Sequence, residues 1–402
     1  MFDTEIHLRD GRLHANRVIL KNVFGFFDGL DEFTSDSEHF DLTKCNYPPE
    51  VTVESLRYIM AFVYSIVMIP EVEAIRNGPA PTKEHLKITL DYFGASDALT
   101  RKIEWHQQEK REDVPTLKQC IEKNDISLVK WMMQVVSPIE ALMWASKEGR
   151  TEIVKLLLDR VTDQNVMYKD THGNTALLWA SKEGRTEIAK LLVARVTDQH
   201  VTHKDTYGNT ALMWASRNGH TDIVKLLLDR VTDQHVMHAN TYGSTALMWA
   251  SEKGHTEIVK LLMDRVTDQH VMHANAYGNT ALMWASHEGR TEIAKLLLGR
   301  VTDRHVMHTN DNGGTALMMA SESGHEIAKL LLGRVTDQHV MHANNDGTTA
   351  LMMASESDHP EIVKLLMDRV TDQHVMHANN EGTTALMMAC GHLEIVKLLI
   401  DK

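Results

Sequence analysis

Residues 208–228 decide the fold and read GNTALMWASRNGHTDIVKLLL. This stretch has the start and stop signals of two short helices. The hydroxyl of Thr210 can cap the free amides of a first helix, and Gly219 can end it. Thr221 can cap a second helix, in which apolar residues recur with a 3.6-residue period and Lys225 is free to face water. The stretch therefore predicts a pair of short antiparallel helices.

The same pattern recurs at steps of 34 or 35 residues. The alanine of its Thr-Ala-Leu segment stands at Ala176, Ala211, Ala246, Ala281, Ala316, Ala350 and Ala385. A further copy at Ala141 has Glu140 in place of threonine, and a weaker leader begins at Thr116. No unit of this size buries its apolar faces alone. We therefore predict a mainly α protein, an α-solenoid of eight repeats that follow one degenerate unit.

Each connection between one helix pair and the next has turn chemistry. Residues 231–243 contain the β-prone pair Val236-Met237 and then an Asn-rich turn that ends in glycine. Such a segment favours a projecting hairpin. We expect exposed tips at Tyr207, Tyr242 and Tyr277.

Length and charge exclude several classes of protein. A chain of 402 residues is longer than one core, which rarely passes about 250–300 residues. The composition is 43% hydrophobic and 24% charged, which is typical of folded proteins. A formal net charge of −13 provides no general basic field for phosphates. We expect neither nucleic-acid nor membrane partners.

The repeat resembles the ankyrin repeat. The family pattern Gly-x-Thr-Pro-Leu-His-x-Ala-Ala corresponds to residues 208–216, and its Gly-His-x-Glu-Val-Val-Lys-Leu-Leu-Leu corresponds to residues 219–228. The resemblance covers residues 115–402 and implies stacked helix pairs that bind a protein in a concave groove. Every unit departs from the family in having Ala-Met or Ala-Leu in place of Pro-His. This departure predicts apolar packing where the family has histidine hydrogen bonds between repeats.

Residues 1–105 do not repeat and predict a small α+β domain. A turn around Asp10-Gly11 predicts a hairpin, and residues 40–42 predict a short strand. Helices are expected over residues 17–27, 55–64 and 85–92. Residues 106–114 are then a linker before the array.

The order of these elements resembles the BTB/POZ domain. The residues that carry the resemblance are Leu13-His14-Ala15-Asn16-Arg17, Leu20, Phe26-Phe27, Phe40-Asp41-Leu42 and the helix from Val53 to Tyr64. BTB domains commonly recruit cullin-3 ubiquitin ligases, so the resemblance implies a cullin-3-type scaffold as a partner. The combination with ankyrin repeats resembles viral proteins of giant DNA viruses of amoebae.

The sequence carries no catalytic motif. Phosphate-binding Gly-x-Gly loops, His-Glu-x-x-His and Gly-x-Ser-x-Gly are absent, and Cys45, Cys120 and Cys390 are far apart. The first residues are acidic and lack an apolar run typical of a secretory signal. We therefore expect a non-enzymatic protein without cofactor or metal, located in the cytoplasm or nucleus.

A His-Val-x-His segment recurs in six units. Its histidines are His200 and His203, His235 and His238, His270 and His273, His305 and His308, His339 and His342, and His374 and His377. On a hairpin arm, residues three apart point to opposite faces and chelate poorly. We interpret these histidines as surface or repeat-packing residues. A metal-binding or pH-sensitive ladder is the alternative.

Tryptophans form a second ladder, which methionines continue at Met319, Met353 and Met388. Residues three and four beyond each tryptophan share its helix face. The predicted protein-binding groove comprises Trp144, Lys147, Glu148, Trp179, Lys182, Glu183, Trp214, Arg217, Asn218, Trp249, Glu252, Lys253, Trp284, His287 and Glu288. The alternative is that the tryptophans only pack between neighbouring first helices.

The sequence thus predicts a protein-protein interaction adaptor. The array captures a protein target, and the BTB-like domain docks a partner such as a cullin-3-type ubiquitin ligase. The alternatives are a plain scaffold or host-interaction protein without a ligase link, and a His-rich metal-responsive binder.

Overall fold

The computed structural model describes residues 4–8, 11–15, 39–41, 117–126, 129, 138–324 and 326–401. The chain divides into two units, Met1–Tyr168 and Lys169–Lys402. The boundaries expected at residues 105 and 114 lie outside the described residues, as do the helices expected over 17–27, 55–64 and 85–92.

The first unit contains a three-stranded sheet of order β2-β1-β3. Strands β1 (Thr4–Leu8) and β2 (Gly11–Ala15) pair antiparallel, with Leu8 opposite Gly11. This pairing confirms the hairpin predicted from the Asp-Gly turn. Strand β3 (His39–Asp41) runs parallel to β1 and begins one residue before the predicted strand.

Four helices of the first unit follow in sequence. They are α7 (Leu117–Glu122), α9 (Pro138–Glu148), α10 (Thr151–Leu158) and α11 (Asp163–Val166). Helix α9 packs against both α7 and α10. The Arg150 side chain donates hydrogen bonds to the carbonyls of Ile121 (3.0 Å) and Glu122. The degenerate leader therefore packs on the first full helix pair as a repeat would.

The second unit repeats three helices along the chain. The first helices are α12 (Ala176–Lys182), α15 (Ala211–Asn218), α18 (Ala246–Lys253), α21 (Ala281–His287), α24 (Ala316–Glu322), α27 (Ala350–Glu356) and α30 (Ala385–Met388). The second helices are α13 (Thr186–Val193), α16 (Thr221–Leu228), α19 (Thr256–Met263), α22 (Thr291–Leu298), α25 (Ile327–Leu332), α28 (Pro360–Met367) and α31 (Leu393–Ile400). Each first helix begins at the alanine that the repeat pattern predicts.

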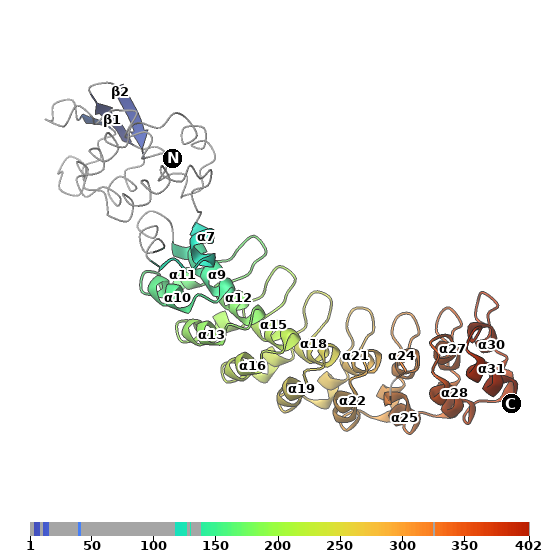
Figure 1. Ribbon diagram of the computed structural model, residues 1–402. Coiled ribbons are helices and arrows are strands. Elements are labelled where there is room, and N and C mark those ends of the chain that lie inside the picture. Colours follow the sequence, from blue (N-terminus) through green and yellow to red (C-terminus); the bar gives the residue numbers. More distant parts are fainter. Residues whose placement is uncertain are drawn as a thin grey trace. The chain divides into compact units, whose positions relative to one another are not determined.

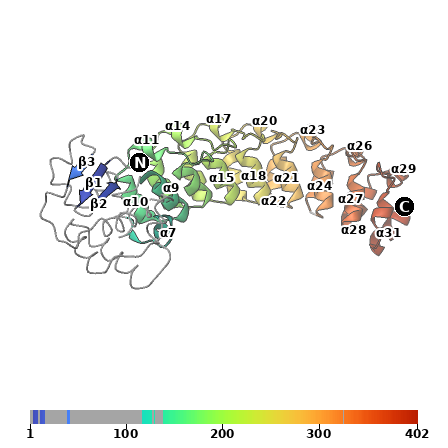
Figure 2. The same ribbon diagram turned by 90° about the horizontal axis from the view of Figure 1, so that it is seen from above.

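The first and second helices of this unit form two parallel rows, and the hairpin loops project on the side of the first helices (Figure 1). A third helix of four residues follows six of the seven helix pairs and lies along one edge of the rows (Figure 2). These short helices are α14 (Asp198–Val201), α17 (Asp233–Val236), α20 (Asp268–Val271), α23 (Asp303–Val306), α26 (Asp337–Val340) and α29 (Asp372–Val375). Within this unit the chain is a helical solenoid.

In the repeat that begins at Thr210, two of the three predicted helix-end signals hold, as does the exposed position of Lys225. The Thr210 hydroxyl accepts a hydrogen bond from the Met213 amide, as a capping residue should. Gly219 ends α15 in the left-handed conformation with φ of 80°, and Lys225 is exposed. The capping role predicted for Thr221 is wrong, because His220 is the N-cap residue and Thr221 is the first helical residue.

The core lies between the two rows of helices. In one repeat Ile223, Val224 and Leu227 are fully buried, and Met213 is 1% exposed. This burial confirms the apolar packing predicted where the family pattern has Pro-His. Because α15 packs on α18 and α16 packs on α19, each repeat covers the apolar face of its neighbour. In the described part of the chain, no helix is long and apolar enough to cross a membrane.

The connection between repeats differs from the predicted hairpin. Val236 lies in helix α17 and Met237 caps it, so the expected strand there is wrong. Thr232 is the N-cap residue of this helix, and Val236 anchors it with 3% exposure. The hairpin itself is reduced to one bridge, Ala239 to Thr245. The Thr-Asp pair before the segment favours a helical turn over a strand, since both residues start helices well.

Neighbouring hairpins are joined by backbone hydrogen bonds. The Thr241 amide donates to the Tyr207 carbonyl at 3.0 Å, and the contact recurs in the other hairpins of the second unit. The turn requires glycine at Gly208, where φ is 78° and a Cβ atom would lie 3.2 Å from the Thr241 nitrogen. Close approach of one hairpin to the next thus depends on this residue.

The prediction that the paired histidines lie on a hairpin arm is wrong. The first of each pair lies in the short helix, where His235 Nδ1 is 2.8 Å from the Thr232 hydroxyl. The second reaches the preceding repeat, where His238 Nε2 donates to the Gly208 carbonyl at 2.9 Å. Burial lowers the pKa of His238, and the bond to Gly208 only partly offsets it. The second histidines are therefore repeat-packing residues.

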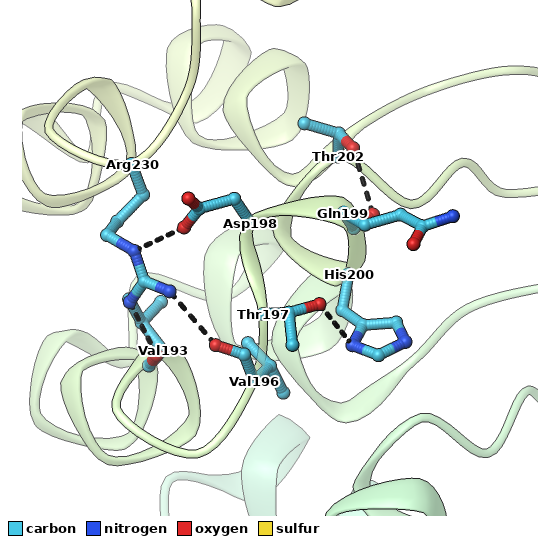
Figure 3. A network of polar contacts seen from close by, with 8 residues as sticks. All are labelled: Val193, Val196, Thr197, Asp198, Gln199, His200, Thr202 and Arg230. Carbon is cyan, nitrogen blue, oxygen red and sulfur yellow. Dashed lines mark hydrogen bonds and ion pairs between the residues drawn. The ribbon is translucent and has the colours of Figure 1, made fainter.

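In five repeats of the second unit, an arginine that follows the second helix binds the preceding repeat, as Figure 3 shows for Arg230. Arg230 donates through Nε to Asp198 at 2.7 Å and through its other nitrogens to the carbonyls of Val193 (2.8 Å) and Val196 (3.0 Å). Val193 is the last residue of α13 and otherwise has no helical partner for its carbonyl. The same three bonds recur at Arg265, Arg300, Arg334 and Arg369. These residues are called the arginine clamp below.

We predict that Arg265→Ala lowers the free energy of unfolding by about 1–3 kcal/mol, because two carbonyls and a carboxylate lose a charged donor. Arg265→Lys restores the charge but reaches fewer acceptors, so it should recover only part of the loss. Urea unfolding followed by circular dichroism measures both. Lys260→Ala on an exposed position of α19 is the control and should change little. Equal stability of Arg265→Ala and the control would contradict a structural role for the clamp.

Candidate protein-binding groove

A groove of about 590 Å³ runs along three repeats on the hairpin side of the first helices. It is lined by His172, Asn174, Trp179, Lys182, Asp205, Tyr207, Asn209, Trp214, Arg217, Asn240, Tyr242 and Trp249. The lining residues come from helices α12, α15 and α18 and from the hairpins that precede them. The groove therefore lies on the face that the tryptophan ladder predicts.

The indole rings form a continuous row because each occupies the same position in successive first helices. Trp179, Trp214 and Trp249 are each half-buried. The ring centroids of Trp214 and Trp249 are 5.5 Å apart, with the planes tilted by 47°. The prediction that these tryptophans pack between neighbouring helices is therefore partly right, yet each keeps part of its ring at the groove surface.

Two cations lie over the indole rings, and each contacts two of them. The Lys182 ammonium is 5.1 Å from the Trp179 ring centroid and 4.4 Å from that of Trp214. The Arg217 guanidinium carbon is 5.7 Å from Trp214 and 5.1 Å from Trp249. Contacts of this kind are favourable because the face of an indole carries negative charge density. The result is a cluster of three indoles and two cations, called the Trp-cation stack below.

Acidic side chains accept hydrogen bonds from the indole nitrogens. Trp214 Nε1 donates to Asp205 Oδ2 at 3.2 Å, and Trp179 Nε1 donates to Asp170 at 3.1 Å. Burial alone would raise the pKa of Asp170. Hydrogen bonds from the Asn174 backbone and side chain, with smaller contributions from the His172 amide and Trp179, outweigh burial and lower the pKa instead. The Asp170 carboxylate thus stays charged and can hold the orientation of the Trp179 ring.

The same acidic residues shape the hairpins. Asp205 Oδ1 accepts the amides of Tyr207 (2.9 Å) and Asn209 (2.8 Å), and Asp205 is only 8% exposed. In the next repeat, Asn240 accepts the corresponding amides and also donates to the Asn209 side chain at 2.8 Å. Sequence reasoning missed these residues. An Asp or Asn three positions before each turn glycine was the available signal.

Tyrosines stand at the hairpin tips. Tyr207 is 52% exposed, Tyr242 47% and Tyr277 57%, and the rings of Tyr207 and Tyr242 stack at 6.5 Å. Tyr207 and Tyr242 line the groove, whereas Tyr277 lies at the next tip and does not.

The structure brings together only some of the predicted groove residues. Trp179, Lys182, Trp214, Arg217 and Trp249 line it. The residues four positions beyond each tryptophan do not line the groove, because the first helix ends there. Glu183 and Glu288 are C-cap residues. Asn218 and Lys253 are the last residues of their helices.

Asn218 instead donates to the Lys182 carbonyl at 2.7 Å. Glu252 lies outside the groove lining and pairs with Lys253 at 2.7 Å. Trp284 and His287 belong to the next repeat and are also outside the lining, with His287 paired to Glu288 at 3.1 Å.

The remaining predicted positions lie in the first unit. Lys147 lies over the Trp144 ring at 5.4 Å, which repeats the contact of Lys182 with Trp179. Glu148 is the last residue of α9. Among the residues that the structure describes, no group of three or more His, Cys, Asp or Glu side chains could hold a metal ion.

A helical solenoid with a groove beside its hairpins defines a repeat protein that binds other molecules along one face. The family model of ankyrin repeats (3 copies) matches residues 117–205, 195–273, 266–342 and 327–402. The chain therefore belongs to the ankyrin repeat family. Proteins of this family are generally non-enzymatic interaction modules, and no catalytic family is indicated. A search of curated proteins found no match.

Proposed function

We propose that this chain is a non-enzymatic adaptor whose groove captures one protein target. Ankyrin repeats indicate a role in protein-protein interaction. The observation that carries the proposal is the Trp-cation stack, which places aromatic rings and an arginine in one groove. Trp, Tyr and Arg are the residue types that contribute most binding energy at protein interfaces.

The groove suits an extended segment of a partner. It runs over three repeats, and its floor of indoles is bordered by the stacked rings of Tyr207 and Tyr242. Large aromatic side chains offer much contact area and lose little conformational entropy on binding. Asp205 and Asn240 already fix the hairpins, so the groove is preorganised and little ordering is needed when a partner binds.

We predict that Trp214→Leu combined with Trp249→Leu weakens target binding by about tenfold or more, since the loss of aromatic contacts at a hot spot costs over 1 kcal/mol. Leucine keeps much of the apolar packing, so the fold should persist. The target is captured from the native cell and identified by mass spectrometry, and binding to the purified full chain is then measured by calorimetry.

Trp284→Leu is the matched control, because Trp284 has the same position in its helix but does not line the groove. It should leave affinity unchanged within about twofold. If all three substitutions unfold the protein without a separate effect on binding, the tryptophans serve packing alone and the groove assignment is wrong.

For the N-terminal region, we infer a BTB-like docking domain over residues 1–105, a linker over 106–114 and the array from residue 115. The antiparallel pair β1 and β2 and the parallel strand β3 support this interpretation, together with the sequence resemblance described above. The partner that this resemblance favours is a cullin-3-type scaffold, which would make the chain a substrate adaptor of a ubiquitin ligase. A plain scaffold without ligase link is the second candidate.

We predict that the full chain binds the purified N-terminal region of a cullin-3-type scaffold. The acidic net charge of −13 should also make association faster at low salt if the cullin surface is basic. Biolayer interferometry with the immobilised full chain measures both effects, and a chain lacking residues 1–114 is the control. Capture of the ankyrin target without any cullin binding would favour the plain scaffold.

A further inference from the structure

We propose that the groove selects an acidic segment of its partner, in which carboxylates bind Lys182 and Arg217. This inference rests on the proposed function of the groove and specifies the chemistry of the ligand. Lys182 and Arg217 are then the residues that determine specificity, while the tryptophans supply most of the contact area.

Both cations lack a carboxylate partner in the described part of the chain. Lys182 and Arg217 contact only indole rings through their charged groups. Asp205, the carboxylate in the groove lining, is committed to the Trp214 indole and to Asn209. The groove therefore presents two positive charges that its own acidic residue does not neutralise. A partner with carboxylates complements this charge.

A basic partner is disfavoured for two reasons. An indole row of this kind would otherwise be a good site for a lysine, an arginine or a methylated lysine. Lys182 and Arg217 already lie over the rings of Trp179, Trp214 and Trp249, and each contacts two of them. A further cation at these rings would also be repelled by the two like charges.

Two separate cations favour a segment that carries several carboxylates. Both cations contact the Trp214 ring, whose centroid is 4.4 Å from the Lys182 ammonium and 5.7 Å from the Arg217 guanidinium carbon. An extended chain can present successive carboxylates along such a groove, so each cation can bind one.

The charge pattern also fixes where the acidic segment lies. The residues that replace Lys182 and Arg217 in later repeats are Glu252, His287, Glu322 and Glu356. The positive charge is therefore confined to the section of the groove formed by α12 and α15. We expect the carboxylates of the ligand at that end, with uncharged or basic residues toward Glu252.

The test is selection from a random twelve-residue peptide library displayed on phage, with the full chain as bait. We expect enrichment of Asp and Glu over the starting library. Synthetic copies of the selected peptides should lose at least about tenfold in affinity for the variant Lys182→Glu with Arg217→Glu, and binding should weaken as salt rises. The matched control is Lys225→Glu with Lys260→Glu, which changes the net charge equally on exposed positions of the second helices.

The selected peptides test the acidic ligand and the proposed groove separately. Peptides that depend on Trp214 but carry no excess of acidic residues overturn this inference and leave the proposed groove intact. If no selected peptide depends on Trp214, the proposed groove is wrong as well. A phosphoserine version of a selected peptide that binds more tightly than its glutamate version overturns the choice of carboxylate over phosphate.

Discussion

The arginine clamp is the constraint on which the array depends. An ankyrin helix pair is too small to have a closed core, so its stability comes from contact with its neighbours. Arg230 makes that contact specific, because it satisfies the carbonyls of Val193 and Val196 and an ion pair with Asp198 at once. The clamp repeats at five positions in the second unit. In these five repeats it holds the register of the repeat on the one before.

The groove follows from this register. The clamp acts at the second helices and short helices, and the hairpin ladder acts at the opposite edge, where the Thr241 amide bonds to the Tyr207 carbonyl. With both edges fixed, the ring centroids of Trp214 and Trp249 come within 5.5 Å, and the Arg217 guanidinium contacts both rings. The binding surface is therefore built by contacts between repeats rather than within any one of them.

Much of the second unit could be predicted from the sequence, because its helix signals are local. Thr210 and Gly219 act within a few residues of the ends that they determine. The clamp could not be found this way, since Arg230 and Asp198 are 32 residues apart and near-identical units repeat every residue equally. Of the positions three beyond tryptophan, Lys182 and Arg217 line the groove, whereas Glu252 and His287 do not. The position four beyond tryptophan does not line the groove, because the first helix ends there.

Adjacent repeats stabilise one another through the arginine clamp. Hydrogen exchange followed by mass spectrometry tests it most directly, with the wild type compared with Arg300→Ala. Arg300 binds the end of α19 and Asp268. The account predicts faster exchange in α19 and α22, with α13 and α28 unchanged, because each repeat contacts only its neighbours. Equal acceleration throughout the array, or none in α19, would contradict it.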